Sequence, residues 1–253
     1  MSQFGNDYSK VYDILYKKKN YIKEFNLIHN KIKKYKKDSK SILELGCGTG
    51  QYTKLFAKKK YSVIAVDMSQ PMLKLAKKKC KNAKDLIFIK RDLLKFSYPK
   101  KFDVVTSLFD VVSYISNKNG LSNFFNNSRK NLKDKGILIF DFWNKKGVLK
   151  LKPENRFKIF NYKKLEILKL NSPNWYKNQN LISVNTKLFI LNKKTKKFIK
   201  INENHLMKYF DLKKIKYELK KNNFKFLEWV EITNNKNKLD NCWSILVIAK
   251  KIS

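Results

Sequence analysis

Residues 42 to 50 read Ile-Leu-Glu-Leu-Gly-Cys-Gly-Thr-Gly, and this stretch decides the fold. An apolar run ends in glycines at three alternate positions, 46, 48 and 50, and the residues that follow have helical spacing. The pattern predicts a buried strand, a tight glycine turn and the start of a helix, which is how α/β proteins bring backbone close to a nucleoside cofactor. Glycine is required there because a β carbon would block the ligand and disfavour the backbone angles of the turn.

The glycine spacing and its neighbours indicate the kind of cofactor. G-x-G-x-G differs from the dinucleotide fingerprint G-x-G-x-x-G, and Glu44 stands two residues before the first glycine, where a carboxylate would serve a pyrophosphate poorly. A cofactor with a cationic methionine end would tolerate Glu44. The next apolar run, residues 61–66, ends in Asp67, and a carboxylate at that place can accept both hydroxyls of a ribose.

Two more strands are predicted to end at the same edge of the sheet. Residues 86–90 lead to Asp92, a candidate acceptor for an adenine amino group, and residues 102–109 open into a loop. After the preceding strand, Met68 is a candidate to pack on a purine. Ser69 is predicted to cap a helix with a proline in its first turn.

In these segments the sequence resembles the class I S-adenosylmethionine-dependent methyltransferases, through residues 42–50, 66–69, 91–92 and 102–105 in the order and spacing of that family. The resemblance implies an α/β fold, Rossmann-like and doubly wound, with a mostly parallel seven-stranded sheet and a small antiparallel β insertion near the C-terminal half. It implies S-adenosyl-L-methionine as the cofactor, without a metal. The residues expected to bind this cofactor are Tyr8, Tyr12, Lys19, Glu44, Gly46, Cys47, Gly48, Asp67, Met68, Asp92, Leu93 and Leu108.

One methyltransferase domain is predicted over residues 1–253. Apolar residues at three- and four-residue steps predict helix over 7–37, and residues 181–191 and 197–201 flank a turn in the manner of a β-hairpin. Asp211 is predicted to cap a late helix. The predicted division is an N-terminal helical segment covering the cofactor (1–40), a cofactor-binding core (41–150), an inserted antiparallel sheet on the acceptor side (151–210), and a closing helix and strands (211–253).

Length and composition are those of a globular protein. A chain of 253 residues and 30.2 kDa suffices for one full α/β domain with insertions. The sequence has no basic-then-apolar leader and no apolar run of about 20 residues, so no membrane association is expected. Three scattered cysteines argue against a disulfide scaffold and, with only two histidines, against a zinc site. We expect a reduced, cytoplasmic protein whose oligomeric state stays open, a homodimer included.

The formal net charge of +38 is a feature that nucleic-acid binders share. Only three of the 58 basic residues are arginine, however, although sites that recognise phosphate or guanine favour the arginine fork. The lysines are spread along every segment, so compositional drift and a surface for polyanions both stay open. Nucleic acid is the less favoured partner, and in either case the charge favours an anionic small-molecule acceptor.

Regions outside the cofactor motifs bear on the methyl acceptor. Residues 8–21, 141–143 and 203–210 are similar to those of methyltransferases that dimethylate the amine of nucleotide-linked amino-deoxysugars, and the similarity runs over 7–250. It implies N-methylation of an amino-sugar or nucleotide-sugar. The alternatives are a small-molecule O-methyltransferase and an RNA methyltransferase that uses the basic surface. Against RNA, the loop at 107–110 lacks an Asn/Asp-Pro-Pro-aromatic motif.

Methyl transfer is an in-line displacement, so catalytic groups are expected mainly to position and desolvate the reactants. His205 is the candidate base or acceptor anchor because its unperturbed pKa suits proton transfer near neutral pH. A structural histidine is an equal alternative. Asp110 is a candidate to orient an acceptor amine, and Phe109 and Trp143 are candidate walls of the acceptor pocket.

The first predicted helix contains a further candidate group. Tyr8, Tyr12 and Tyr16 fall on one face, which core packing would also explain. The resemblance favours Tyr8 or Tyr12 closing over the cofactor, where an aromatic face stabilises a cation by roughly 0.5–2 kcal/mol. Lys19 would neutralise the methionine carboxylate, although a solvated lysine face explains the run at 17–19 better.

Overall fold

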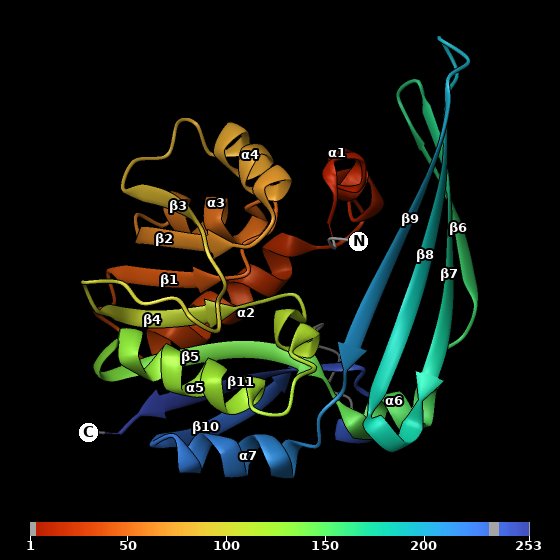
Figure 1. Ribbon diagram of the computed structural model, residues 1–253. Coiled ribbons are helices and arrows are strands. Elements are labelled where there is room, and N and C mark those ends of the chain that lie inside the picture. The colour runs from red at the N-terminus through yellow and green to blue at the C-terminus, as the bar shows by residue number, and fades with distance from the viewer. Residues whose placement is uncertain (1–3, 233–237, 253) are drawn as a thin grey trace.

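The computed structural model describes residues 4–232 and 238–252, and it shows an α/β body with a long four-stranded sheet standing beside it (Figure 1). The body contains a seven-stranded sheet in the order β10-β11-β5-β4-β1-β2-β3. Strands from β5 to β3 pair in parallel, and β11 is antiparallel to both β5 and β10. This arrangement confirms the predicted fold class. The strands are β1 (Ser41–Leu45), β2 (Ser62–Asp67), β3 (Leu86–Lys90), β4 (Phe102–Ser107), β5 (Leu132–Trp143), β10 (Phe224–Glu231) and β11 (Ser244–Lys251).

Helices cover both faces of this sheet. Leu43 and Leu45 of β1 belong to the apolar cluster under α5 and α7, whereas Ile42 belongs to the cluster under α2, α3 and α4. Because both faces are buried, the strands read in the sequence as nearly continuous apolar runs. The helices are α1 (Asn6–Leu15), α2 (Tyr21–Tyr35), α3 (Gln51–Lys58), α4 (Gln70–Lys79), α5 (Gly120–Asn131), α6 (Lys145–Leu151) and α7 (Leu212–Lys221).

The N-terminal segment differs from the helix predicted over 7–37, because two helices with a break at 16–20 occupy it. The side chain of Asn20 accepts a hydrogen bond from the Lys23 amide and begins α2 anew. As a result α2 packs on the body, whereas α1 packs between the body and the second sheet, with Tyr8 buried in a cluster that includes Ile167 of that sheet (Figure 1).

The second sheet is fully antiparallel, in the order β6-β7-β8-β9, and includes the predicted hairpin as β8 and β9. It is larger than the small insertion expected, since β7 and β8 have 12 residues each. β6 and β7 were not located from the sequence because apolar residues lie on both of their faces. Phe157, for example, is 74% exposed on the outer face. The strands are β6 (Arg156–Tyr162), β7 (Leu165–Tyr176), β8 (Leu181–Asn192) and β9 (Phe198–Lys208).

Local capping signals were predicted correctly. Ser69 accepts from the Met72 amide at the start of α4, and Asp211 accepts from the Lys213 amide at the start of α7. Within residues 4–232 and 238–252, no helix has the length and apolar character needed to cross a bilayer. The same ranges contain no cluster of three or more His, Cys, Asp or Glu side chains suited to hold a metal ion.

Candidate active site

The glycine turn lies at the carboxyl end of β1, next to β4, where the strand order of the sheet reverses. Gly46, Gly48 and Gly50 all have positive φ, at 80°, 52° and 75°. A β carbon at Gly46 would lie 2.5 Å from a methyl carbon of Val111, whereas one at Gly48 would meet nothing within 4 Å. Gly46 is therefore required by packing as well as by its φ. Gly48 instead borders open space, as expected for backbone that a ligand approaches.

Asp67, at the end of β2, lies directly beside this turn. Its carboxylate accepts hydrogen bonds from the amides of Gly48 and Ser69, both at 2.8 Å. Burial raises the pKa of Asp67, and these amide hydrogen bonds oppose that rise. Met68 follows with 64% of its surface exposed, at the rim of the site. The structure thus places a carboxylate and an apolar side chain beside the glycine turn, and their contacts with a ribose and a purine stay predictions.

Glu44 is the buried carboxyl group beneath the turn. It is 1% exposed, and one of its oxygens accepts a hydrogen bond of 2.5 Å from the Thr53 hydroxyl. Burial raises the pKa of Glu44 to about 8; the bond from Thr53 opposes this shift and the nearby Asp67 adds to it. Near neutral pH this group is therefore readily protonated, and its charge responds to what binds above it.

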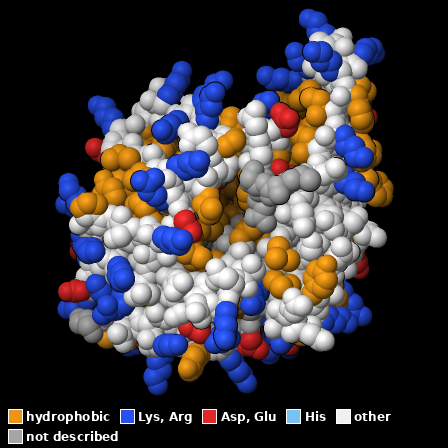
Figure 2. Space-filling model, in the orientation of Figure 1, with side chains coloured by type: hydrophobic (Ala, Val, Ile, Leu, Met, Phe, Trp, Pro, Cys, Tyr) orange, Lys and Arg blue, Asp and Glu red, His pale blue; other side chains and the backbone are white. Residues whose placement is uncertain are grey.

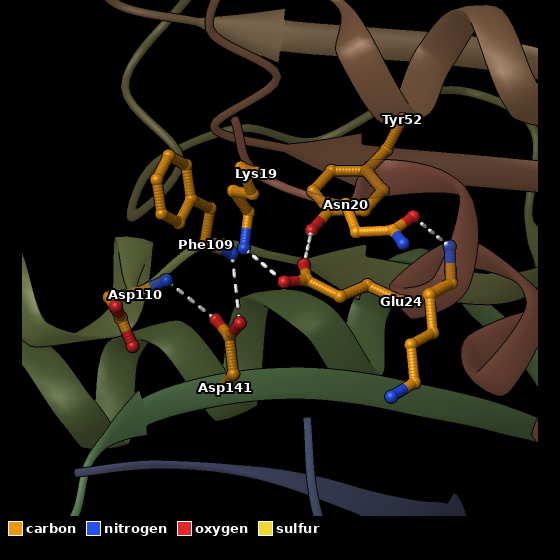
Figure 3. Close-up of polar contacts among 8 residues, drawn as sticks. Lys19, Asn20, Glu24, Tyr52, Phe109, Asp110 and Asp141 are labelled. Carbon is orange, nitrogen blue, oxygen red and sulfur yellow. Dashed lines mark hydrogen bonds and ion pairs between the residues drawn. The ribbon is translucent and has the colours of Figure 1, made fainter. Parts of the chain in front are cut away.

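The loop after β4 is held in an unusual conformation at the same edge of the sheet. Phe109 and Asp110 both have positive φ, at 68° and 61°. Their amides donate to the two carboxylate oxygens of Asp141 at 2.9 and 2.7 Å (Figure 3). Burial, followed by the charge of Asp110, raises the pKa of Asp141 well above its usual range. Two successive left-handed residues other than glycine are costly, so Asp141 is the group that fixes this loop.

Lys19 lies apart from the position expected for it. Its ammonium forms an ion pair with Glu24, which also accepts from the Tyr52 hydroxyl (Figure 3). The same nitrogen lies 4.5 Å from the centre of the Phe109 ring. These groups border a side cavity of 340 Å³ behind the 109–110 loop, and Lys19 does not line the main cavity described below. Lys19 is thus paired with Glu24 in this structure, and its contact with the cofactor carboxylate stays a prediction.

Helix α1 closes over the glycine turn and is tied to the body in its last turn. Asp13 accepts hydrogen bonds from the Thr49 hydroxyl at 2.7 Å and from the side-chain NH2 group of Gln51 at 3.1 Å. The other oxygen of Asp13 forms an ion pair of 2.8 Å with Lys79 of α4. Tyr8, Tyr12 and Tyr16 face the cavity beneath the helix, so this stripe is both buried packing and cavity wall.

The start of α1 is tied to the second sheet. The carboxylate of Glu203 in β9 accepts from the amides of Phe4 and Gly5, both at 3.0 Å. These amides precede the first turn of α1 and have no partner within the helix. A carboxylate is favoured there because the helix N-terminus has a partial positive charge. The helix therefore joins the body and the second sheet above the cavity.

His205 lies two residues further along β9 and is 6% exposed. Its Nδ1 is 3.2 Å from the hydroxyl of Tyr114, which lies in the 3-10 helix η1 (Val111–Tyr114), while its Nε2 is buried without a hydrogen-bond partner among the described residues. Burial and the charge of Lys169 lower the pKa of His205 to about 4, so its ring is neutral near pH 7. By contrast, His29 stacks on Phe25 in α2, as expected of a structural residue.

A main cavity of 920 Å³ brings these elements together between the strand ends, α1 and the inner face of the second sheet. Figure 2 shows hydrophobic side chains gathered in the hollow between body and sheet, within a lysine-rich surface. Asp110 lines it, although its carboxyl also approaches the side chains of Ser244 and Trp143. Of the predicted residues, those that line it are Tyr8, Tyr12, Glu44, Gly46, Cys47, Gly48, Asp67, Met68, Asp92, Leu93, Leu108, Phe109, Asp110, Trp143 and His205.

Sequence reasoning missed several residues of this site, among them Asp13, Tyr114, Lys169 and Glu203. Each acts through a partner far away in the chain, as Glu203 does with Phe4, and such pairing leaves no local pattern. The one available signal was the hairpin itself. Alternation along β9 places Glu203 and His205 on the same face of the sheet.

Comparisons with known proteins agree with this geometry. Residues 42–136 match the model of a methyltransferase domain family. A solved S-adenosylmethionine-dependent methyltransferase from Clostridium acetobutylicum superposes with a TM-score of 0.82 over 98% of this chain and 99% of its own, at 24% identity. Residues 42–136 therefore match a methyltransferase domain, and the chain as a whole has the fold of this solved methyltransferase, in agreement with the resemblance found in the sequence motifs.

Two relatives illustrate the similarity in sequence. The protein YqeM of Bacillus subtilis is 30% identical over 117 residues, which are 46% of this chain and 47% of that protein. The dTDP-3-amino-3,4,6-trideoxy-alpha-D-glucopyranose N,N-dimethyltransferase of Streptomyces venezuelae is 26% identical over 139 residues, 54% of this chain and 57% of that enzyme. The chain thus spans about half the length of the curated relatives it matches.

Proposed function

We propose that this protein transfers a methyl group from S-adenosyl-L-methionine to the amine of a small molecule, with an amino-sugar or nucleotide-sugar as the preferred acceptor. The observation that supports this most is the main cavity itself. It extends without interruption from the glycine turn to His205 on the inner face of the second sheet. One end has the groups expected of a cofactor site, and the other has room for an acceptor.

The residues at the cofactor end fit S-adenosylmethionine, which supplies a methyl group on a positively charged sulfur. Gly48 borders open space, so the backbone can be approached closely. Asp67 would accept the ribose hydroxyls, and Asp92 lies where the adenine is expected. Tyr8 and Tyr12 would cover the methionine end from α1. No metal ion is needed in this scheme, because the leaving sulfur requires no Lewis acid.

The acceptor end would position an amine and keep water away from it. In the reaction the nitrogen lone pair forms a bond to the methyl carbon, and the electrons of the broken carbon–sulfur bond stay on sulfur. The acceptor must react as the neutral amine, so its ammonium proton passes to water before attack and the product nitrogen carries the positive charge after methylation. The unpartnered Nε2 of the neutral His205 would accept a hydrogen bond from an N–H of that amine and so orient its lone pair. Tyr114 would hold the histidine ring in place through Nδ1. Phe109 and Trp143 would wall off solvent.

The preference for an amine is supported by the relative that N,N-dimethylates a dTDP-linked amino-sugar. We further propose that the cofactor is covered by residues 1–40 and held by 41–150, and that residues 151–210 supply the acceptor side. Nothing in the cavity favours a hydroxyl or an RNA over an amine.

A methyl-transfer screen tests the proposal. The protein with labelled S-adenosylmethionine would be offered nucleotide-linked amino-sugars, their hydroxyl analogues and total RNA. We expect label in an amino-sugar. Label in a hydroxyl analogue or in RNA, with none in any amine, would overturn the acceptor class. Absence of S-adenosylmethionine binding in a separate titration would overturn the activity.

A further inference from the structure

The inner face of the second sheet has a group of hydrogen-bond donors on β6 and β7, and one of them, Lys169, is near enough for its charge to lower the pKa of His205 on β9. Lys169 and Asn171 alternate on β7 and line the main cavity, and Arg156 of β6 lies directly opposite Asn171 in the antiparallel ladder. Arg156 and Lys169 are therefore diagonal neighbours on one face, with β carbons about 7 Å apart. Two cations and an amide thus meet at one place in the cavity wall.

These donors lack partners of opposite charge within the described part of the chain. Neither Lys169 nor Arg156 forms an ion pair with a carboxylate there. The ammonium of Lys169 lies 5.1 Å from the centre of the Tyr16 ring. The carboxamide oxygen of Asn171 accepts from the Thr186 hydroxyl at 2.9 Å, which leaves its NH2 group available to a ligand. Glu154, the one carboxylate that lines this end, is exposed and bound to neither cation.

The ladder on this face adds a second observation. Lys158 stands directly opposite Lys169. Like charges in directly opposed positions of a sheet destabilise the pair. Arg156, Lys158 and Lys169 therefore repel one another on this face of the β6–β7 pair. An anion bound among them would relieve that repulsion. The compositional excess of lysine does not account for Lys169, which is partly buried in the cavity wall, whereas Lys187 on the outer face is exposed.

We propose that Lys169, Arg156 and Asn171 form an anion-binding subsite, so that the methyl acceptor has a phosphate or carboxylate group remote from its amine. This inference rests on the proposed function for the identity of the acceptor, but the subsite itself does not require it. His205 pairs with Val184, which pairs with Pro173 on β7, so two strand spacings separate the histidine from the strand of Lys169. Two strand spacings amount to about 10 Å between the backbones, and Asn171 and Lys169 lie two and four residues along β7 from Pro173.

The test is calorimetric titration of the full protein with inorganic diphosphate and, separately, with malonate, at about 0.15 M salt. Lys169→Met keeps most of the aliphatic stem and removes the charge. We expect it to weaken binding of the favoured anion at least tenfold, and the exposed Arg156→Gln to weaken it at least threefold. Lys187→Met, on the opposite face of the same sheet, is the matched control and should change the affinity by less than twofold.

Stronger binding of diphosphate would identify a phosphate ester as the acceptor group, and stronger binding of malonate would identify a carboxylate. Equal affinities of wild type, Lys169→Met and Lys187→Met for both anions would overturn the subsite, since the general surface charge would then explain all binding. If Lys169→Met does not fold, two other variants test the subsite. Arg156→Gln should weaken anion binding at least threefold, whereas Lys169→Arg should bind the anion within threefold of wild type. S-adenosylhomocysteine titrated into the same samples separates the two proposals, because its failure to bind would refute the methyltransferase activity and leave the subsite standing.

Discussion

The two ends of the main cavity are built from different kinds of contact. At the cofactor end, Asp67 holds an amide only 19 residues away, and strand, turn and helix follow one another in the chain. At the acceptor end, Glu203 binds the amide of Phe4 from 199 residues away, and His205 meets Tyr114 across 91 residues. A cofactor site of this kind can be recognised from a contiguous motif, whereas the acceptor site exists only once distant segments have packed.

The largest difference between the two ends is expected from His205→Ala, which should lower turnover and spare cofactor binding. Removing the hydrogen-bonding ring should lower kcat about 10²-fold, because the acceptor amine would lose the group that orients it and a misplacement of the reactants by about 1 Å can cost about 10²-fold. Binding of S-adenosylmethionine should stay within twofold of wild type. Single-turnover rates and calorimetric titration would measure the two effects. His29→Ala is the control and should leave both unchanged; a wild-type kcat in His205→Ala would leave the histidine a structural role only.

Asp67→Ala, at the other end of the cavity, is expected to weaken cofactor binding and to leave the acceptor end unchanged. Loss of the carboxylate should weaken S-adenosylmethionine binding by about 1–3 kcal/mol, which is roughly 5- to 150-fold, since ribose hydroxyls would lose a buried partner. Binding of an anionic probe at the acceptor end should not change. Asp7→Ala, at an exposed position of α1, serves as the control. Normal cofactor affinity in Asp67→Ala would contradict the placement of the ribose.

The two ends should also respond oppositely to pH. The pKa of Glu44 is raised from 4.5 to about 8, so its contribution to stability is full below pH 4.5 and is lost as pH rises towards 8. The pKa of His205 is lowered from 6.5 to about 4, so stability is full above pH 6.5 and falls as pH falls towards 4. Each slope should be at most about 1.4 kcal/mol per pH unit.

Urea unfolding from pH 4 to pH 8.5 would measure these slopes. In Glu44→Gln, the difference in unfolding free energy from wild type should change steadily between pH 4.5 and 8. In His205→Gln, it should change between pH 6.5 and 4. Parallel curves for wild type and both variants would show that neither group has a shifted pKa.

The smallest effect is expected where α1 joins the two ends. Asp13→Ala removes the ion pair with Lys79 and the hydrogen bonds from Thr49 and Gln51. We expect S-adenosylhomocysteine to dissociate about fivefold faster, corresponding to roughly 1 kcal/mol for a partly exposed ion pair. Stopped-flow displacement would measure the rate. Lys10→Met removes an exposed ion pair of the same helix and should have no effect; equal rates in the two variants would show that α1 does not retain the ligand.

The sequence was sufficient for the body of the fold and for the conformation of the glycine turn. The apolar runs of β1, β2 and β4 are unambiguous because both faces of the sheet are buried, and the three glycines adopt the positive φ that their spacing suggested. Ser69 and Asp211 cap helices through contacts two or three residues away, so they too are encoded locally.

The remainder depended on tertiary contacts. The break between α1 and α2 was hidden because apolar residues continue at helical spacing on both sides of Asn20. Lys19 was placed with the cofactor, but Glu24 one turn into α2 and the Phe109 ring hold it in the side cavity. The donors at Arg156 and Lys169 face the cavity only because of the register between β6 and β7, which no single strand reveals.

The carboxylate of Glu203 has a consequence for the order of events in a catalytic cycle. It holds the two amides that precede α1 on the same strand that carries His205, so the helix and this wall of the cavity are joined. If S-adenosylhomocysteine binds beneath α1 as proposed, its release would require these hydrogen bonds to break. A ligand at one end would then change the affinity for a ligand at the other, by the same factor in both directions, although the two need share no contact.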